Sequence, residues 1–567
     1  MARQTPAIVV LGSGSLETAR RLQQCYPDAM IHGLTGRVEG ADRLYDEFGT
    51  TLRQLYRNDT PIIALCAAGI VIRTLASELL EKGAEPPVLA VAEDGSAVVP
   101  LLGGLGGVNL MAREIAATLG VAPAITTSGE LRFGTCLLNP PDGYALADLE
   151  QGKRFVSDLL AGESVRIEGA APWLDSANLP HDHQARLSIH VGSSERAPSP
   201  HELLIYPRNV LVAVGADLNN AVTAVRQALQ DRKLALPALA CLVAARSAMA
   251  HPALAQAAAE LGVPLRFVDG PGDAGELAVR ALPDSLPVVA NTDLALVVAS
   301  QPIDARTIGQ RRGRLAVIGL GPGAADLMVP AVKTELAQAD DVLGYETYVR
   351  MAGPFRPDQV LHCTDNREEM QRARHAFELA SQGRSVVVVS SGDPGVFAMA
   401  AAVLEALHES HESDWHNVDV QILPGVSASL ATAAQAGAPL GHDFCVLSLS
   451  DNLKPWAIIE KRLELACQAD LALAFYNPIS RSRPWQLGRA LEIVAAHRDG
   501  MTPVVLGRDI GRPGQTLRTT TLERLTPDQV DMRTMVLVGS STTCVFPRAD
   551  GGSWTYTPRW YGQRPDS

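Results

Sequence analysis

Five loop sequences rich in glycine, aspartate, serine and asparagine lie in the C-terminal half of this 567-residue chain, each directly after an apolar run. They are GLGPG (319–323), SSGDPGVF (390–397), LPGVSASLA (423–431), FYNP (475–478) and LGRDIGRPGQTL (506–517). Glycine lets a ligand approach the backbone closely, and the polar side chains can form hydrogen bonds with amines and hydroxyls. Because open α/β sheets bind ligands at the carboxyl ends of their strands, five such loops in order predict one shared ligand site.

The first loop indicates which kind of ligand to expect. Its three glycines alternate, whereas a dinucleotide fingerprint has the pattern G-x-G-x-x-G, and Pro322 has no N–H group to offer a pyrophosphate. Asp340 and Asp341 follow about 20 residues later, where a ribose-binding acid would lie, so an NAD site stays open as an alternative. A ligand without phosphate fits the five loops better.

The elements that must position these loops are short apolar runs, each followed by a helical pattern. Runs such as AIVVLG, RLAVIGLG, SVVVVSSG and LALAFYN precede segments of about ten to fifteen residues with helical periodicity. This alternation continues from end to end of the chain. It predicts an α/β fold class with several α/β domains, in which parallel or mixed sheets are covered on both faces by helices.

Breaks in composition divide the chain into four regions. A polar, proline-containing stretch at 172–202 marks the first break, and a basic run of arginines precedes the first glycine loop. The predicted regions are an N-terminal α/β domain (1–140), a middle or linker region (141–202), a second α/β domain (203–305) and a C-terminal unit (313–555).

Composition argues against several function classes. A net charge of −13 does not attract nucleic-acid phosphates or anionic lipid, so neither is an expected partner. Eight cysteines lie far apart without a C-x-x-C pair, which predicts reduced thiols and no metal site. No uncharged apolar stretch reaches the roughly 18 residues of a membrane helix, and MARQTPAIVVLGSGS enters a strand without a signal segment. We expect a cytoplasmic protein.

The order of the five loops resembles that of the tetrapyrrole methyltransferases of cobalamin (corrin ring) biosynthesis. Three segments, GYETYV (344–349), SSGDPGVFAMA (390–400) and APLGHDFCVLSLSDNLKPW (438–456), are similar to the precorrin-3B C17-methyltransferase branch of that family. The resemblance covers about residues 313–550 and implies two α/β subdomains with a cleft between them, a homodimer, and S-adenosylmethionine as methyl donor. It also implies the reaction, C17-methylation of the tetrapyrrole precorrin-3B with ring contraction to precorrin-4.

Site residues follow from the resemblance, motif by motif. Those implied for S-adenosylmethionine are Gly392, Asp393, Pro394, Val396, Ser427, Ala428, Asn477, Asp509 and Ile510. Those implied for the tetrapyrrole are Gly321, Pro322, Gly323, Arg508 and Arg512. The two arginines are included because the substrate carries many carboxylates, which a guanidinium can bind through paired hydrogen bonds.

The chemistry of the reaction sets a further requirement. Methyl transfer from a sulfonium needs alignment of donor and carbon, and orientation alone supplies about 7–11 kcal/mol of a barrier. Ring contraction needs more, because a hydroxyl at C20 loses its proton while a ring bond migrates, so one positioned base is expected. The candidates are His442, Asp443 and Tyr345. In the alternative interpretation, His442 only fixes a loop by hydrogen bonding.

The N-terminal half resembles the cobalt-precorrin-5A hydrolase family, which opens a lactone on a contracted corrin. The similar segments are PIIALCAAGIVIRTLA (61–76), AEDGSAVVPLLGGLGGVNLMAREIA (92–116), AITTSGELRFG (124–134) and NVLVAVGADLNNAVTAVRQAL (209–229). Leu105 stands about where that family has a histidine, and Ala248 and His251 stand near its lysine and glutamate. The polar residues that remain in its strand-end loops are Glu93, Asp94, Asn109 and Glu130. We expect incomplete hydrolase activity and a half that binds or hands over corrinoid intermediates.

Three other functions stay open. One is the cobalt-precorrin-3 reaction of the same C17-methyltransferase, together with an active cobalt-precorrin-5A hydrolase. Another is a non-catalytic corrinoid-binding carrier, against which the five unbroken loops argue. The last is an NAD oxidoreductase, which requires the first glycine loop to hold a pyrophosphate.

Overall fold

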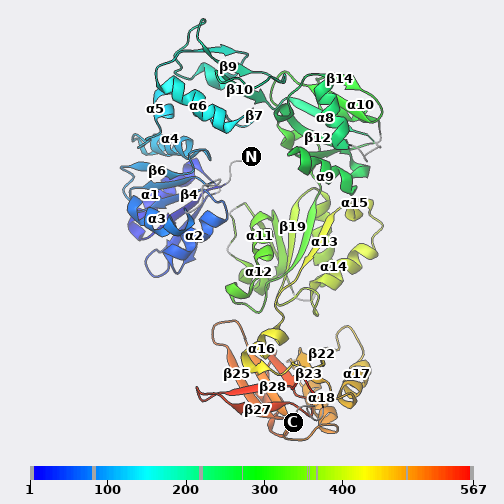
Figure 1. Ribbon diagram of the computed structural model, residues 1–567. Helices are drawn as coiled ribbons and strands as arrows, with labels where there is room; N and C mark the ends of the chain where they lie inside the picture. The colour runs from blue at the N-terminus through cyan, green and yellow to red at the C-terminus, as the bar shows by residue number, and fades with distance from the viewer. Residues whose placement is uncertain are drawn as a thin grey trace. The chain divides into compact units, whose positions relative to one another are not determined.

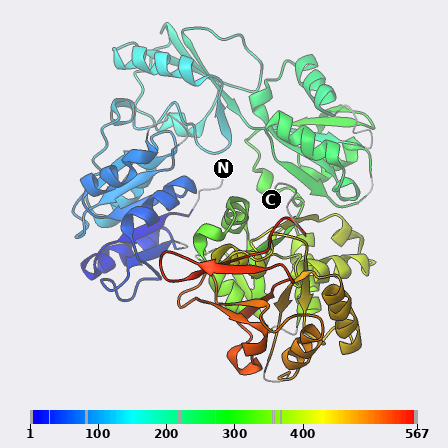
Figure 2. The ribbon, with the colours of Figure 1, turned by 60° about the horizontal axis from the view of Figure 1, so that its bottom comes forward.

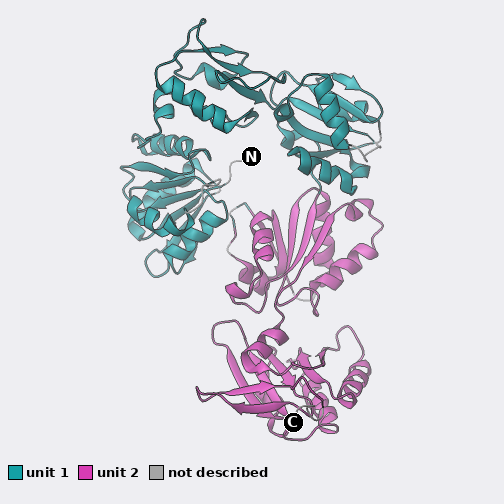
Figure 3. Cartoon of the chain, in the orientation of Figure 1, with its two compact units in different colours: residues 1–312, 356–358 teal, residues 313–355, 359–567 magenta. Residues whose placement is uncertain are grey.

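The chain divides into two compact units, residues 1–312 with 356–358 and residues 313–355 with 359–567 (Figure 3). Both consist of sheets with packed helices, which confirms the predicted α/β class (Figure 1). Among the helices that the structure describes, none is long and apolar enough to cross a bilayer. The structure, a computed structural model, describes residues 5–27, 29–79, 85–215, 221–270, 272–353, 355–356, 358–365, 368–480 and 483–561.

The first unit begins with a six-stranded sheet in the order β3-β2-β1-β4-β5-β6, in which only β6 is antiparallel. Helices cover both of its faces, because neighbouring residues of β1, such as Ile8 and Val9, belong to different core clusters. The strands are β1 (Ala7–Val10), β2 (Met30–Leu34), β3 (Arg43–Tyr45), β4 (Ile62–Leu65), β5 (Val88–Val91) and β6 (Val98–Leu102). The helices are η1 (Ser13–Ser15), α1 (Leu16–Cys25), α2 (Phe48–Arg57), α3 (Ala68–Leu75), η2 (Ala76–Glu78), α4 (Val108–Leu119) and α5 (Ser128–Phe133).

A second sheet, in the order β7-β10-β9-β8, occupies much of the region predicted as middle or linker (141–202). Leu187, Ile189 and Val191 alternate on β9 and are all buried, so the polar stretch 172–202 contains a core strand. Surrounding prolines and charged residues conceal this alternation in the sequence. The elements are β7 (Tyr144–Leu146), α6 (Leu149–Leu160), β8 (Val165–Glu168), α7 (Pro172–Asp175), β9 (Leu187–Val191) and β10 (Glu202–Pro207).

A third sheet completes the first unit, in the order β13-β12-β11-β15-β14. Its central strand β11 is buried along its whole length. The strands are β11 (Val210–Val214), β12 (Leu239–Ala245), β13 (Leu265–Val268), β14 (Pro287–Ala290) and β15 (Leu294–Val298). The helices are α8 (Ala221–Asp231), η3 (Leu236–Ala238), η4 (Arg246–Ala248), α9 (Pro252–Leu261), α10 (Ala274–Ala281) and η5 (Ala305–Thr307).

The second unit opens with a fully parallel sheet in the order β18-β17-β19-β16-β20. Leu315 and Val317 pack on one face of β16 and Ala316 and Ile318 on the other, which explains the continuous apolar run. The strands are β16 (Arg314–Gly319), β17 (Asp341–Tyr345), β18 (Val360–Thr364), β19 (Ser385–Ser390) and β20 (Asp419–Leu423). The helices are η6 (Ala325–Leu327), α11 (Pro330–Gln338), α12 (Glu346–Ala352), α13 (Glu369–Ser381), α14 (Met399–His408) and α15 (Ser413–His416).

A mixed sheet follows, in the order β22-β23-β26-β24-β25, with a small third sheet β21-β28-β27. Helix α16 contacts both sheets. The strands are β21 (Gly437–Ala438), β22 (Phe444–Ser448), β23 (Ala472–Tyr476), β24 (Pro503–Arg508), β25 (Thr516–Thr521), β26 (Thr534–Val538), β27 (Cys544–Pro547) and β28 (Ser553–Tyr556). The helices are α16 (Ala428–Ala436), α17 (Trp456–Gln468), α18 (Gln486–Ala495), η7 (Leu522–Arg524) and η8 (Pro527–Gln529).

Candidate active site

The first two predicted loops meet at a reversal in the parallel sheet. The chain leaves β16 toward β17 and leaves β19 toward β20, so these neighbouring strands have connections that run in opposite directions. Such a switch point is where open α/β sheets bind ligands. Here Gly321 N donates to Gly392 O at 3.1 Å and Gly392 N donates to Gly321 O at 2.8 Å. The two loops are therefore joined through their backbones.

A third loop packs directly against this pair. A Cβ atom at Gly319 or at Gly425 would overlap the carbonyl oxygen of Gly392, so these two positions exclude a side chain. The Asp393 carboxylate accepts from Gly395 N at 2.8 Å and from Gly425 N at 3.0 Å. Asp393 thus fixes both its own turn and the loop that precedes α16, and each oxygen keeps a free lone pair for a ligand.

The loop before α16 is tied in turn to the end of β23. Ser427 caps α16, and its hydroxyl lies 3.0 Å from that of Ser429. The Tyr476 hydroxyl accepts from Ser429 N at 3.2 Å and lies 3.2 Å from the Ser429 hydroxyl. Ser427 is therefore connected through Ser429 to Tyr476 of the FYNP loop, and Ala428 lies between the two serines.

The mixed sheet brings three more loop residues to one edge. Strands β22, β23 and β24 run in the same direction, so Ser448, Tyr476 and Arg508 end them at the same edge. Asn477, directly after β23, donates through Nδ2 to Ser448 Oγ at 3.1 Å. This places the predicted residue Asn477 in the same neighbourhood as Ser427.

Backbone strain is concentrated in these loops. Among the described residues, six that are not glycine have a positive φ. Three of these six are Phe397 (53°), Asn477 (49°) and Asp509 (52°). Such conformations cost about 1–3 kcal/mol each and cluster at ligand sites. Asparagine and aspartate tolerate them, whereas phenylalanine seldom does. The strain therefore coincides with the loops that the motifs selected.

Arg508 and Asp509 pair with each other, and each also pairs with one further charged residue of the same chain. The buried Asp509 carboxylate accepts from Arg508 Nη1 at 3.0 Å and from Arg533 Nε at 2.6 Å. Arg508 also donates to Asp531 at 2.8 Å, and this hydrogen bond raises the pKa of the guanidinium. The structure therefore gives Arg508 two carboxylates of its own chain, which does not support the predicted contact with substrate carboxylates. Ile510 is buried beside them.

Arg512 has a different environment. Its Nε donates to Pro322 O at 2.9 Å and its Nη2 donates to Ser391 Oγ at 3.2 Å. The guanidinium also lies over Gly323, whose missing side chain leaves it room. Within the described residues Arg512 forms no ion pair, so its charge is left for an anionic group at the glycine loops.

The three candidate bases are not brought together. Tyr345 ends β17 at the carboxyl edge, with its ring 5.4 Å from that of Tyr348. His442 and Asp443 instead precede β22, at the edge opposite Ser448. His442 Nδ1 accepts from Asp443 N at 2.8 Å, as in the loop-fixing interpretation. Their predicted catalytic role is not supported by this position, because a whole strand separates them from the loops.

Asp340 and Asp341, the two acids on which the alternative NAD site depends, lie at the amino end of β17. Asp341 begins β17 and Asp340 directly precedes it, whereas the glycine loop follows the carboxyl end of β16. Asp340 accepts from Ser385 N at 2.8 Å, and the buried Asp341 pairs with His362 at 2.9 Å and with Arg384. Neither carboxylate can reach a ribose at the carboxyl edge.

Beside the N-terminal sheet, two of the predicted polar residues, Asn109 on α4 and Glu130 on α5, lie together. Asn109 Nδ2 donates to Glu130 Oε1 at 2.7 Å, and Arg113 Nη1 donates to Glu130 Oε2 at 3.0 Å. Asp94 is used within its own turn, where it accepts from Ser96 N at 3.0 Å, and Glu93 is exposed.

The remaining positions of that half have local roles. His251 caps α9 by accepting from Ala253 N at 3.3 Å, and Leu105 is exposed in the glycine-rich turn. A separate group, Glu168, His190 and Glu202, has potential ligand atoms within 4.8 Å of one another. Arg196 pairs with both of its carboxylates and Arg166 also pairs with Glu168, and these two positive charges balance the two carboxylates that would attract a cation.

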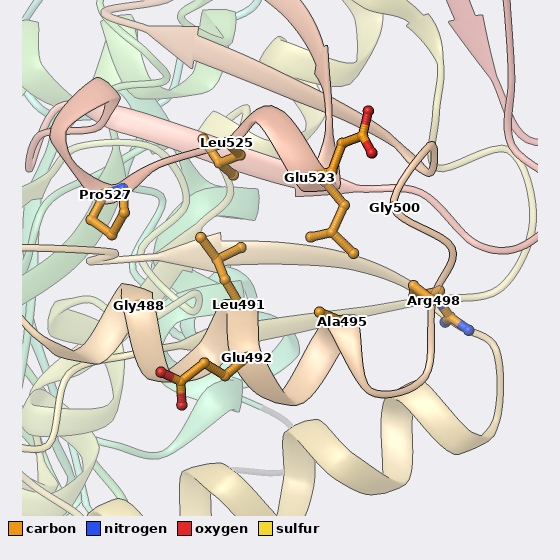
Figure 4. A pocket seen from close by; sticks show the side chains of 10 residues that line it. Gly488, Leu491, Glu492, Ala495, Arg498, Gly500, Glu523, Leu525 and Pro527 are labelled. Carbon is orange, nitrogen blue, oxygen red and sulfur yellow. The ribbon is translucent and has the colours of Figure 1, made fainter.

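One hollow of about 400 Å³ lies elsewhere in the second unit, between α18 and the helices η7 and η8 (Figure 4). Its walls include Leu491 and Leu525, and the carboxylates of Glu492 and Glu523 lie at its rim. None of its lining residues belongs to the five loops. The sequence analysis does not single it out.

Two side chains beside the loops were missed by the sequence analysis. Phe397 follows the last predicted residue of the GDPGV loop and is 53% exposed. Lys454 lies in the long segment 438–456, with Nζ 5.9 Å from the centroid of the Phe397 ring. The segment 438–456 contains both Lys454 and His442. The sequence interpretation selected His442, which lies at the end of the segment away from the strand-end loops.

Comparison with known proteins gives two family matches. A family model described as tetrapyrrole (corrin/porphyrin) methylases matches residues 314–526, and one described as cobalamin synthesis G N-terminal matches residues 50–130.

Individual relatives each match less than half of this chain. A Sinorhizobium protein, precorrin-3B C(17)-methyltransferase, is 47% identical over 249 residues, which are 44% of this chain and 97% of the relative. A probable cobalt-factor III C(17)-methyltransferase of Salmonella typhimurium is 41% identical over 44% of this chain and 99% of the relative. The cobalamin biosynthesis protein CobIJ of Mycobacterium bovis is 47% identical, but the match spans only 50% of it. The crystal structure of the methyltransferase CobJ is 50% identical and covers 43% of this chain and 100% of that one, with a TM-score of 0.41.

Proposed function

Because this chain belongs to the tetrapyrrole methylase family through residues 314–526, we propose that its second unit methylates C17 of precorrin-3B from S-adenosylmethionine, with ring contraction to precorrin-4. The two resemblances seen in the sequence are confirmed, and the chain is a methyltransferase of cobalamin biosynthesis fused to an N-terminal relative of a second cobalamin family. The substrate is taken from the named relatives.

The observation that carries the proposal is the connected set of strand-end loops. Hydrogen bonds join Gly321 to Gly392, Asp393 to Gly425, and Ser429 to Tyr476, so three motif loops and the end of β23 form one structure. The residues fit S-adenosylmethionine, which carries no phosphate. A Cβ at Gly392 would lie 3.7 Å from Ser427 Cα, in ordinary van der Waals contact, so the missing side chain leaves a space of about one methyl group between these two loops for a ligand. A free carboxylate lone pair on Asp393 suits a hydroxyl or an amine.

The chain's own residues then supply alignment and charge. S-adenosylmethionine, when bound, supplies a methyl group on a sulfonium. The glycine loops and the amide of Asn477 would orient donor and carbon, which is the larger part of this catalysis. Arg512 would hold a substrate carboxylate at the glycine loop. Of the three candidate bases, Tyr345 ends β17 at the carboxyl edge of the parallel sheet, where the glycine loops also lie, and this position supports Tyr345 as the base for the C20 hydroxyl.

The N-terminal unit has a separate proposed role. The match over residues 50–130 supports corrinoid binding or transfer of intermediates. Glu130 is engaged by Asn109 and Arg113, and His251 is engaged as a helix cap, so neither is placed as a free hydrolytic base. The cytoplasmic location stays a prediction.

We propose a homodimer through the second unit. The hairpin of β27 and β28, red in Figure 2, exposes Val545, Phe546 and Trp554 by 44%, 48% and 37%. All four residues of β27 are exposed, and β27 is an edge strand with one unpaired side. Exposed apolar residues gathered on one hairpin are typical of an interface.

The test is anaerobic incubation of the full-length protein with precorrin-3B and methyl-labelled S-adenosylmethionine, followed by mass and absorbance of the product. A labelled, ring-contracted product is expected from the natural chain and from Glu405→Ala, an exposed position on α14, but not from Asp393→Ala. Transfer only to the cobalt-containing substrate would replace precorrin-3B by that substrate. No transfer to either, with donor bound, would overturn the methyltransferase proposal in favour of a carrier.

A further inference from the structure

The long segment 438–456 runs through β22, so its two ends lie at opposite edges of the mixed sheet. His442 lies before the strand, away from the strand-end loops. Ser448 ends the strand beside Asn477, and the following residues up to Pro455 lead into α17. The part of the segment that reaches the site is therefore the loop that carries Lys454.

Phe397 offers an aromatic face at the same place. It follows Val396 of the predicted cofactor loop, has a φ of 53°, and is 53% exposed. Its ring lies 5.4 Å from the Tyr476 ring, tilted by 61°, and the Tyr476 hydroxyl is held by Ser429. Phe397 is thus exposed, has a strained backbone and is held by the Tyr476 ring. Such strain is typical of ligand sites, so a ligand beside the Phe397 ring would account for it.

Lys454 occupies part of that face. Its Nζ lies 5.9 Å from the Phe397 ring centroid, within the range of a cation–π contact. Within the described residues it forms no hydrogen bond and no ion pair, although the chain has 62 acidic residues against 49 lysines and arginines. The side chain is half-buried, and burial, with the charge of Arg462 nearby, lowers its pKa. A cation held in this way lacks the anion that would balance it.

We propose that Lys454, held over Phe397, binds a peripheral carboxylate of the tetrapyrrole substrate next to the methyl-donor loops. The inference rests on the proposed function and adds a specificity-determining residue to it. A carboxylate also belongs to S-adenosylmethionine, so donor and tetrapyrrole are two sources of the same chemistry. We assign the tetrapyrrole because Lys454 lies outside the five loops, whereas the residues proposed for the donor, Asp393, Ser427 and Asn477, belong to them.

The first measurement is steady-state kinetics of Lys454→Met with precorrin-3B. Loss of one charge-assisted contact predicts a KM for the tetrapyrrole about 10- to 100-fold higher, with kcat changed much less. The Kd of S-adenosylhomocysteine, measured by calorimetry, should stay unchanged. Lys454→Arg should restore most of the KM. Lys461→Met is the matched control, because Lys461 is exposed on the neighbouring α17.

A second measurement does not depend on turnover. Uroporphyrin III, a stable tetrapyrrole with eight carboxylates, is titrated into each variant with S-adenosylhomocysteine present, and binding is followed by absorbance. Weaker binding by Lys454→Met, but not by Lys461→Met, supports the assignment. An unchanged tetrapyrrole Kd and KM, or a loss confined to S-adenosylhomocysteine, would overturn it. The natural chain could transfer no methyl group while Lys454→Met still binds uroporphyrin III more weakly than Lys461→Met. That result would overturn the proposed reaction and would support the carboxylate site.

Discussion

At the scale of single residues, His32 shows how burial decides a charge state. The residue lies on β2 with 5% of its surface exposed, and its Nδ1 has no hydrogen-bond partner among the described residues. Burial, reinforced by the charge of Arg43 and opposed by Asp42, lowers its pKa from 6.5 to about 4. The imidazole is therefore neutral in the folded protein at neutral pH.

The protonation of His32 predicts a pH-dependent stability of the first sheet. Between about pH 4 and 6.5 the unfolded chain binds a proton that the folded chain does not, so the free energy of unfolding falls as the pH falls. From pH 7 to pH 5 the loss is about 2 kcal/mol. Native-state hydrogen exchange of β1–β3 in the full-length protein measures it.

The expected control result is specific to this position. His32→Gln should remove most of the pH dependence of those strands, while His183→Gln, at an exposed histidine, should keep it. If the natural protein and His32→Gln lose protection in parallel between pH 7 and pH 5, the buried imidazole is not the cause.

Residue roles could be predicted where a motif is local, and not where a partner is distant. Asp393 was selected by its motif, and its carboxylate accepts a hydrogen bond from Gly395 N, two residues later in the same loop. The sequence around Arg508 and Asp509 does not predict their partners. Asp531 pairs with Arg508 and Arg533 pairs with Asp509, both from a loop more than twenty residues away. Sequence reasoning therefore left both as free ligand groups.

At the scale of elements, three glycines set how closely the first three loops pack. The carbonyl of Gly392 lies where a side chain at Gly319 or Gly425 would be. Of these, Gly392 alone also has a positive φ, of 69°. Gly319 and Gly425 are therefore required by space rather than by backbone conformation.

Gly425→Ala is predicted to separate the loop before α16 from the GDPGV loop. The added methyl group overlaps backbone, which cannot move aside as a side chain could, so we expect a loss of about 1–3 kcal/mol in stability. The Kd of S-adenosylhomocysteine should rise about 10-fold or more, since each 1.4 kcal/mol is a factor of ten. Thermal unfolding and calorimetry on the full-length protein measure the two effects.

Gly488→Ala is the matched control. Gly488 lies inside α18, where the nearest atom to an added Cβ is Pro527 Cγ at 3.7 Å. An alanine there should be neutral or stabilise by up to about 1 kcal/mol, because glycine weakens a helix interior. Equal donor affinity in Gly425→Ala and the natural chain would contradict the packing argument.

The elements themselves follow from the sequence more readily than their ends do. Apolar runs such as LAVIG identify the buried parallel strands, because both faces are covered. Which edge a flanking residue occupies depends on where the strand lies within the motif. The segment 438–456 contains β22 in its middle, so a histidine and a lysine that share one motif lie at opposite edges of one sheet. The predicted bases His442 and Asp443 therefore lie at the edge away from the strand-end loops, and their role stays a prediction.

At the scale of the whole molecule, the edge strand β27 predicts self-association. Phe546 is 48% exposed and stacks edge-to-face on Tyr556 within the hairpin. Phe546→Asp places a charge at the centre of the exposed apolar face. We expect the full-length natural chain to be a dimer and Phe546→Asp to be a monomer by size-exclusion chromatography with light scattering.

The control for association is a charge on a different exposed apolar position. Leu404→Glu on α14 alters a residue that is 46% exposed and should leave the dimer intact. A dimer that survives Phe546→Asp, or a natural chain that is monomeric at micromolar concentration, would rule out this hairpin as the interface.

The paired backbone hydrogen bonds between Gly321 and Gly392 have a consequence for the order of binding. The loop assigned to the tetrapyrrole and the loop assigned to the donor cannot be ordered independently, because each supplies the other's hydrogen-bond partner. If the first ligand changes the affinity for the second by some factor, the second ligand changes the affinity for the first by the same factor. We therefore expect the two glycines to couple the binding of donor and acceptor, so that each ligand raises the affinity for the other.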